Sequence, residues 1–152
     1  MSMTGIAVMC AWMVANTAVQ KDEVKPRTEV CEAIGEAAQA AGEDPAVLIS
    51  LGWHESRYAR KVTSHKGAQG PLQVIPGYWC PGRTVKGCDL IKAGVRAYTT
   101  YRKKHKGLRE TLCHYNSGNV CYPKSYSYAD SVIRKAKAVR RQVRLVTASL
   151  FQ

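Results

Sequence analysis

Apolar and polar positions follow a helical period over much of the amino-terminal half of the chain. After Thr28, apolar or small residues recur every three to four positions up to Gly42, which predicts a helix that ends there. Asp44 and Pro45 have the chemistry of an N-cap and a first helical position, so a second helix is predicted over 46–57. The pattern therefore indicates two consecutive helices joined by a short turn.

The second half of the chain repeats this period after one long irregular stretch. Residues 62–88 are rich in glycine, proline, serine and threonine, so we expect loops, turns and a short strand pair there. Helical spacing returns over 89–104 and 108–114, and a loop is predicted over 116–127. A long amphipathic helix follows over 128–149. The expected fold class is mainly α, with a small region of loops and short strands.

The amino-terminal segment differs from the rest because residues 1–20 carry no charge. Positions 6–19 are almost wholly apolar, which is the length of a signal-peptide core and short for a membrane span. No lysine or arginine precedes this run, as an export signal would require. Three interpretations stay open: an export signal, a weak anchor to a membrane or to a virion or secretion complex, and a buried helix of the same domain. Residues 21–28 are predicted to link this segment to a domain over 29–150.

Composition adds an electrostatic constraint. The 152 residues include 23 Lys and Arg against 11 Asp and Glu, a net charge of +12 that predicts an anionic partner. With 45% hydrophobic residues the chain can bury one core, which excludes a disordered protein. The final predicted helix has a basic face that is expected to be solvated, and one hypothesis is that it holds the protein to anionic wall polymers or lipopolysaccharide. No base-reading motif accompanies it, so no specific nucleic acid is expected. This face consists of Arg134, Lys135, Lys137, Arg140, Arg141 and Arg144.

The six cysteines form two pairs with seven intervening residues and leave two single residues. The pairs are Cys80–Cys88 and Cys113–Cys121, and the single residues are Cys10 and Cys31. Neither paired spacing suits a zinc site, and the histidines do not add a ligand spacing, so no metal is expected. Two local disulfides explain the pattern better and predict an oxidising compartment. Buried free thiols in a cytosolic protein are the alternative, and the pairing of the two single cysteines stays open.

Glu55 is the first candidate for chemistry. It shares a predicted helix stripe with Leu48 and Leu51, so its carboxyl should point toward the apolar side of the helix. Burial disfavours the charged carboxylate and raises its pKa, which is the condition for donating a proton near neutral pH. The structural alternative is a glutamate at a helix end that pairs with Arg57 or Arg60.

Three blocks of sequence resemble the soluble lytic transglycosylases, which are lysozyme-like enzymes that cleave peptidoglycan and are related to goose-type lysozymes. The blocks occur in the family's order and spacing and cover roughly residues 44–135. They are Glu55-Ser56, the run from Ser64 to Pro76, and His114-Tyr115-Asn116-Ser117-Gly118 followed by Tyr128. The run from Ser64 is similar to Ser-x-x-Gly-Ala-x-Gly-Leu-Met-Gln-x-x-Pro, with Pro71-Leu72 in place of Leu-Met. His114 in place of alanine and the two cysteine pairs are the other departures.

The resemblance implies a lysozyme-like fold and a role for each matching residue. Glu55 would protonate the glycosidic oxygen between N-acetylmuramic acid and N-acetylglucosamine, and then take the proton of the muramoyl C6 hydroxyl as it closes onto C1. The product would be a 1,6-anhydromuramoyl end, formed without water or a cofactor. The implied substrate-binding residues are Ser64, Gln73, Tyr115, Asn116 and Tyr128, of which Tyr128 is expected to contact Glu55.

The distribution of carboxylates gives an independent argument for this mechanism. Ordinary glycoside hydrolysis uses two carboxylates, and no Asp or Glu occurs from Ser56 through Cys88. The remaining candidates for a second carboxylate are Asp89, Glu110 and Asp130. We therefore expect a monomeric enzyme, periplasmic or virion-associated, that cleaves peptidoglycan strands without hydrolysis. The alternatives are a hydrolytic lysozyme on the same fold, a non-catalytic glycan-binding or structural protein, and a basic nucleic-acid-binding module.

Overall fold

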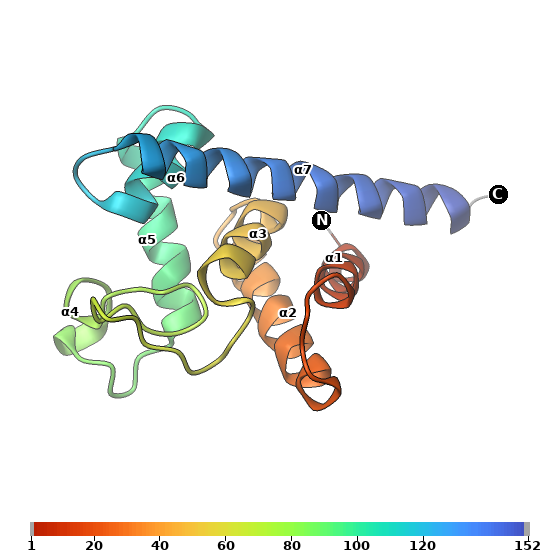
Figure 1. The fold of residues 1–152 in the computed structure, drawn as a ribbon, viewed down its shortest axis with the longest axis horizontal. Helices are drawn as coiled ribbons and strands as arrows, with labels where there is room; N and C mark the ends of the chain where they lie inside the picture. Colours follow the sequence, from red (N-terminus) through yellow and green to blue (C-terminus); the bar gives the residue numbers. More distant parts are fainter. Residues whose placement is uncertain (1, 151–152) are drawn as a thin grey trace.

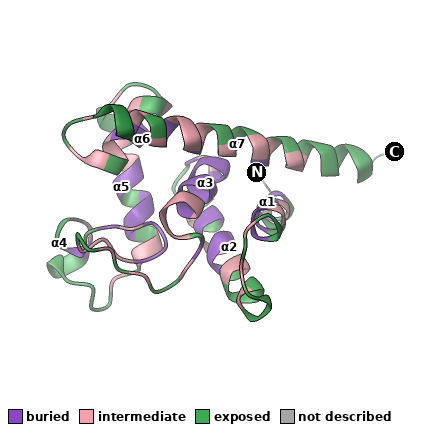
Figure 2. Cartoon of the chain, in the orientation of Figure 1, coloured by how far each residue is buried: buried purple, intermediate pink, exposed green. Residues whose placement is uncertain are grey.

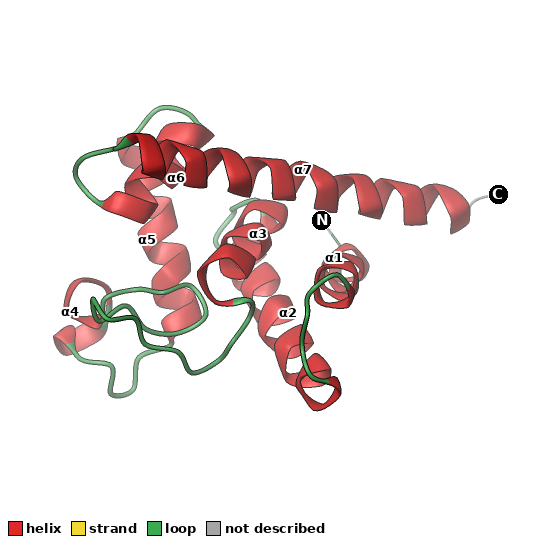
Figure 3. Ribbon diagram, in the orientation of Figure 1, coloured by secondary structure: helices red, strands yellow, loops and turns green. Residues whose placement is uncertain are grey.

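The computed structural model describes residues 2–150, and its regular structure is helical (Figure 1; Figure 3). The predicted mainly α fold is confirmed. The expected strand pair is reduced to two isolated bridges, Thr63–Gln69 and Gln69–Val74. In chain order the elements are α1 (Met3–Ala15), the 3-10 turn η1 (Lys21–Glu23), α2 (Val24–Ala40), α3 (Pro45–Ser56), α4 (Pro76–Trp79), the 3-10 turn η2 (Pro81–Arg83), α5 (Leu90–Lys104), α6 (Leu108–Ser117) and α7 (Pro123–Leu150).

Two helices begin at aspartate caps. The Asp44 carboxylate accepts a hydrogen bond from the Ala46 backbone N–H at 2.9 Å, and Pro45 takes the first position of α3, as the sequence predicts. Asp89 accepts bonds of 3.0 and 3.1 Å from two N–H groups in the first turn of α5. Just after the carboxyl end of α2, Gly42 adopts a positive φ of 74°, which glycine tolerates without strain. These local signals fix both ends of the turn between α2 and α3.

The apolar amino-terminal segment is a helix of the main core. Ile6, Met9 and Met13 of α1 are essentially inaccessible to solvent and belong to the same hydrophobic cluster as the buried residues of α2, α3 and α7. A disulfide between Cys10 and Cys31 joins α1 to α2. Of the three interpretations of this segment, the structure shows the buried helix. Within the described residues, no helix has the length and apolar character needed to cross a membrane.

Residues 21–28 are helical and do not form the expected linker. Lys21–Glu23 make the turn η1, and α2 begins at Val24, so the expected domain boundary at position 29 lies inside a helix. Pro26 is compatible with this start because it falls in the first turn, where the backbone N–H that proline lacks has no intrahelical partner. The charge and proline content of this stretch therefore mark a helix start.

Helix α7 lies across α1, α3 and α6 and covers the side they form (Figure 1). It begins at Pro123, before the predicted start at Tyr128, because proline suits the first helical position. The residues from Arg144 to Leu150 are exposed, and this end of α7 extends past α1. Arg140 forms an ion pair with Asp44, so it is not a free member of the predicted basic face.

Helix α3 lies at the centre of the fold, and its residues from Pro45 to Gly52 are all buried (Figure 2). The long loop that follows α3 lies beside α5 and carries the short helix α4. This loop is anchored by Leu72, which is fully buried against Gly94 of α5. A Cβ atom at Gly94 would lie 2.5 Å from the Leu72 Cβ, so only glycine permits this close contact.

All six cysteines are paired. The predicted disulfides Cys80–Cys88 and Cys113–Cys121 are present, and Cys10–Cys31 is a third. The first two disulfides close short loops, whereas the third joins two helices of the core. Three disulfides are typical of proteins that function in an oxidising compartment outside the cytoplasm.

Candidate functional site

Glu55 lies in the last turn of α3, where the helix passes from the core to the surface. The helix ends after Ser56 because Arg57 and Tyr58 adopt left-handed conformations, with φ of 53° and 64°. Burial raises the pKa of Glu55 from 4.5 to about 7, as expected for a shielded carboxyl, and a hydrogen bond from Tyr128 opposes this shift. None of the ion pairs formed by residues 2–150 involves Glu55. The alternative of a surface pair with Arg57 or Arg60 is therefore not the arrangement found.

Tyr128 joins α7 to the end of α3 at this carboxyl. Its hydroxyl donates a hydrogen bond of 3.0 Å to Glu55 Oε2, which is the contact that the sequence resemblance implies. Burial, followed by the charge of Glu55, raises the pKa of Tyr128 well above its ordinary value. Tyr128 therefore keeps its proton and remains a hydrogen-bond donor to Glu55 across the neutral pH range.

Two further hydrogen bonds hold the three matching sequence blocks together. The Ser56 hydroxyl donates to the Pro71 carbonyl oxygen at 2.8 Å, which fixes the loop to the end of α3. The Tyr115 hydroxyl, from α6, donates to the Leu72 carbonyl oxygen at 2.5 Å. Burial raises the pKa of Tyr115, and the charge of Glu55 raises it further, so the two side chains interact electrostatically. The blocks are distant in sequence but form one cluster around Glu55.

Ser64 and Gln73 hold the loop in shape. The Ser64 hydroxyl oxygen accepts hydrogen bonds from the backbone N–H groups of Lys66 and Ala68, at 3.3 and 3.1 Å. The Gln73 side-chain amide donates to the carbonyl oxygens at positions 62 and 70, at 3.1 and 3.0 Å. The serine hydroxyl hydrogen and the glutamine side-chain oxygen retain hydrogen-bonding capacity. Asn116, on α6, is exposed to solvent. Substrate contact by these three residues stays a prediction.

The three other carboxylates that could have joined Glu55 have different partners. Asp89 caps α5, Glu110 accepts a hydrogen bond from the Tyr126 hydroxyl at 2.9 Å, and Asp130 pairs with Arg109 at 2.8 Å. None of the hydrogen bonds found within the described part of the chain connects these three carboxylates to Glu55. Each of these three carboxylates therefore has a structural partner of its own.

A cluster of cationic and aromatic side chains borders this site, and the sequence did not predict it. The Arg57 guanidinium carbon lies 3.5 Å from the centroid of the Trp53 ring, and the Lys135 ammonium lies 4.0 Å from it. His54 packs edge-to-face against Tyr128, with ring centroids 5.9 Å apart. Burial, and then the charges of Arg57 and Lys135, lower the pKa of His54 to about 4, so it is neutral at physiological pH. The available signal was the seven-residue spacing of Lys135 from Tyr128, which places both on one side of α7.

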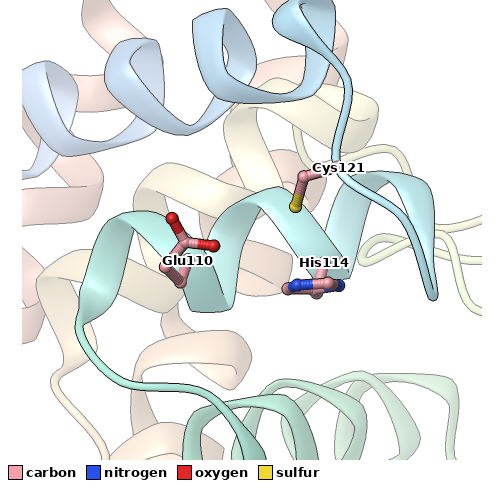
Figure 4. Close-up of side chains that lie close together, drawn as sticks. All are labelled: Glu110, His114 and Cys121. Atoms are coloured by element: carbon pink, nitrogen blue, oxygen red, sulfur yellow. The ribbon is translucent and has the colours of Figure 1, made fainter.

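A second cluster, at α6, combines Glu110, His114 and Cys121, whose ligand atoms lie within 4.8 Å of one another (Figure 4). The spacing of histidines and cysteines along the sequence does not reveal this cluster, because the fold brings Cys121 back beside His114. The Cys121 sulfur is bonded to Cys113, however, and a disulfide sulfur is not the thiolate that a metal requires. His114 also stacks on His105, with ring centroids 3.6 Å apart.

The hydrogen bond from Tyr128 stabilises the charged carboxylate of Glu55. Replacing Tyr128 with phenylalanine removes this bond and is therefore expected to raise the pKa of Glu55 above 7. The side-chain carboxyl carbon of Glu55 reports this pKa in an NMR titration. Tyr126→Phe is the matched control, since Tyr126 donates to Glu110. An identical titration in Tyr128→Phe and the unchanged protein would contradict the contact.

The chemistry open to this cluster is proton transfer. A shielded carboxyl that titrates near neutral pH can donate a proton in one step and accept one in the next. Tyr128 supplies a neutral donor that stabilises the charged form between these steps. Comparisons of the chain with protein-family models, with curated proteins and with solved structures find no match.

Proposed function

We propose that this protein is a peptidoglycan lytic transglycosylase with a lysozyme-like fold, in which Glu55 acts as the single acid and base. The observation that carries the proposal is the shielded Glu55 carboxyl, which is hydrogen-bonded to Tyr128 and bordered by a loop without a second carboxylate. The meeting of three sequence blocks at this carboxyl supports the same assignment.

In the first step, protonated Glu55 donates its proton to the glycosidic oxygen O4, which joins the muramoyl C1 to C4 of N-acetylglucosamine. The C1–O4 bond breaks, the N-acetylglucosamine leaves with its hydroxyl restored, and positive charge develops at C1. Glu55 is now a carboxylate, and the hydrogen bond from Tyr128 stabilises its charge.

In the second step, the Glu55 carboxylate takes the proton from the C6 hydroxyl of the same muramoyl residue. The C6 oxygen forms a bond to C1, which closes the 1,6-anhydro ring and returns Glu55 to its protonated form. Water is not consumed, so no second carboxylate is needed to activate it. A pKa near 7 suits both steps, because the group must first lose and then regain one proton.

The mass of the released fragments tests this proposal. Digestion of purified sacculi in water enriched in oxygen-18 is expected to yield anhydromuramoyl fragments that carry no label at C1. Labelled fragments heavier by one water would instead establish a hydrolytic lysozyme. Binding to the sacculi without any cleavage would favour the non-catalytic glycan-binding alternative.

The disulfides support a location outside the cytoplasm, such as the periplasm or a virion or secretion complex that reaches the cell wall. The proposed partner is the glycan strand of peptidoglycan. Anchoring through residues 1–20 is not part of this proposal, because the apolar side chains of α1 are buried in the core.

A further inference from the structure

The loop that borders the candidate site carries positive charge without any acidic residue. From position 56 to 88 the sequence contains no Asp or Glu, and its cations are Arg57, Arg60, Lys61, Lys66, Arg83 and Lys86. The ion pairs found among residues 2–150 join Glu23 to Arg27, Glu43 to Arg102, Asp44 to Arg140 and Asp130 to Arg109. No cation of this loop takes part in them. Its charge is therefore left for an anion from outside the chain.

Arg57 and Lys135 are two cations of this region that an aromatic ring holds in place. Both contact the Trp53 ring, and the Trp53 indole N–H donates to the Thr17 hydroxyl oxygen at 2.9 Å, which fixes the ring. A guanidinium that stacks through its face keeps N–H donors along its edge, where a carboxylate binds. One nitrogen of the Arg57 guanidinium donates to the Trp53 carbonyl oxygen. The other N–H groups of this guanidinium donate to no side-chain acceptor among residues 2–150.

The shared contact with one ring brings two like charges together. Burial lowers the pKa of Lys135, and the charge of Arg57 lowers it further. This repulsion opposes folding, and it is relieved when an anion joins the two cations. The contacts with the Trp53 ring offset part of this repulsion inside the fold, and an external anion would offset more of it.

The cation pair is connected to Glu55 through Tyr128 and α7. Lys135 follows Tyr128 by seven residues on α7, which is two helical turns or roughly 10 Å. His54 contacts both the Trp53 ring and the Tyr128 ring, with centroids 4.9 and 5.9 Å apart, and it stays neutral, so it adds no charge of its own. A glycan strand that runs from Glu55 along this side of α7 would carry its muramoyl substituents past the cation pair.

We propose that Arg57 and Lys135 form a subsite for carboxylates carried by the muramoyl residues of the strand. This inference rests on the proposed function and specifies its substrate. In intact peptidoglycan the lactyl group is amide-bonded to the peptide stem, so the carboxylates belong to the stem. In strands from which the peptide has been removed, the lactyl carboxylate itself is free.

Binding in the inactive Glu55→Gln background tests the subsite independently of turnover. Soluble glycan fragments with peptide stems are titrated calorimetrically against Glu55→Gln and against the same protein carrying Arg57→Gln and Lys135→Gln. The two additional changes are expected to raise Kd roughly three- to tenfold and to weaken its dependence on salt. Arg57→Lys should recover part of the affinity, because it restores the charge without the planar fork.

The matched control is Arg141→Gln with Arg144→Gln, which removes the same charge from the exposed end of α7. An equal loss of affinity in this control, an unchanged Kd in the Arg57 and Lys135 variant, or no binding of stem-bearing fragments would each overturn the subsite. Fragments without peptide identify the carboxylate: a weakened Kd for these as well assigns binding to the lactyl position, and an effect confined to stem-bearing fragments assigns it to the stem. The proposed function fails separately, if the unchanged protein releases no anhydromuramoyl ends.

Discussion

Glu55→Gln is expected to reduce glycan cleavage by a factor on the order of 10²–10⁴, because an amide can neither donate nor accept the transferred proton. Release of anhydromuramoyl fragments from sacculi measures this loss. Glu110→Gln is the matched control, since Glu110 also accepts a hydrogen bond from a tyrosine but lies outside the cluster at Glu55. Full activity in Glu55→Gln would exclude Glu55 as the acid.

Glu55→Gln is also expected to stabilise the folded protein at alkaline pH. The folded pKa of Glu55 is raised from 4.5 to about 7, so the stability contributed by its protonated form is complete below pH 4.5 and is lost as the pH rises through 7. The neutral amide of glutamine does not undergo this loss. The free energies of unfolding of Glu55→Gln and of the unchanged protein are measured by urea denaturation at pH 5 and pH 8. The difference between them should favour Glu55→Gln more at pH 8 than at pH 5. Equal destabilisation at both values would indicate a structural role for the glutamate.

Removing the disulfide between α1 and α2 is expected to lower the free energy of unfolding by about 3 kcal/mol. Cys10 and Cys31 are 21 residues apart, and this estimate is the chain entropy that a loop of that length regains in the unfolded state. Both cysteines are inaccessible to solvent, so replacing them with serine would bury two hydroxyl groups. Alanine is therefore used at both positions. Denaturation of the double variant in urea measures the effect.

Replacing Cys80 and Cys88 with alanine provides the comparison for this experiment. These residues are eight apart and close a loop in the surface region around η2, so the expected loss is smaller, about 2.6 kcal/mol by the same estimate. A loss well under 1 kcal/mol for the Cys10–Cys31 pair would mean that core packing alone holds α1 in place.

The features that the sequence predicted well are those decided by neighbouring residues. Asp44 caps α3 through a hydrogen bond to the next turn, so a few residues suffice to locate that helix start. The disulfides Cys80–Cys88 and Cys113–Cys121 likewise close short loops. The orientation of Glu55 followed from its place on the apolar stripe of α3.

The features that the sequence did not settle depend on contacts between distant segments. An apolar run such as that of α1 suits an export signal and a core helix equally, and only its packing against α2 distinguishes them. Lys135 belongs to a helix face that was expected to be solvated, yet its ammonium lies over Trp53. The loop-building bonds of Ser64 and Gln73 could not be inferred, because the fold of the loop determines their partners.

The disulfide between α1 and α2 also limits how the chain can mature. Proteolytic trimming after Ala15 would remove Ile6, Met9 and Met13 from the interior and uncover the apolar surface of their neighbours. It would also leave Cys31 as an odd thiol, open to cross-linking with a second molecule. This core therefore exists only in a chain that retains α1.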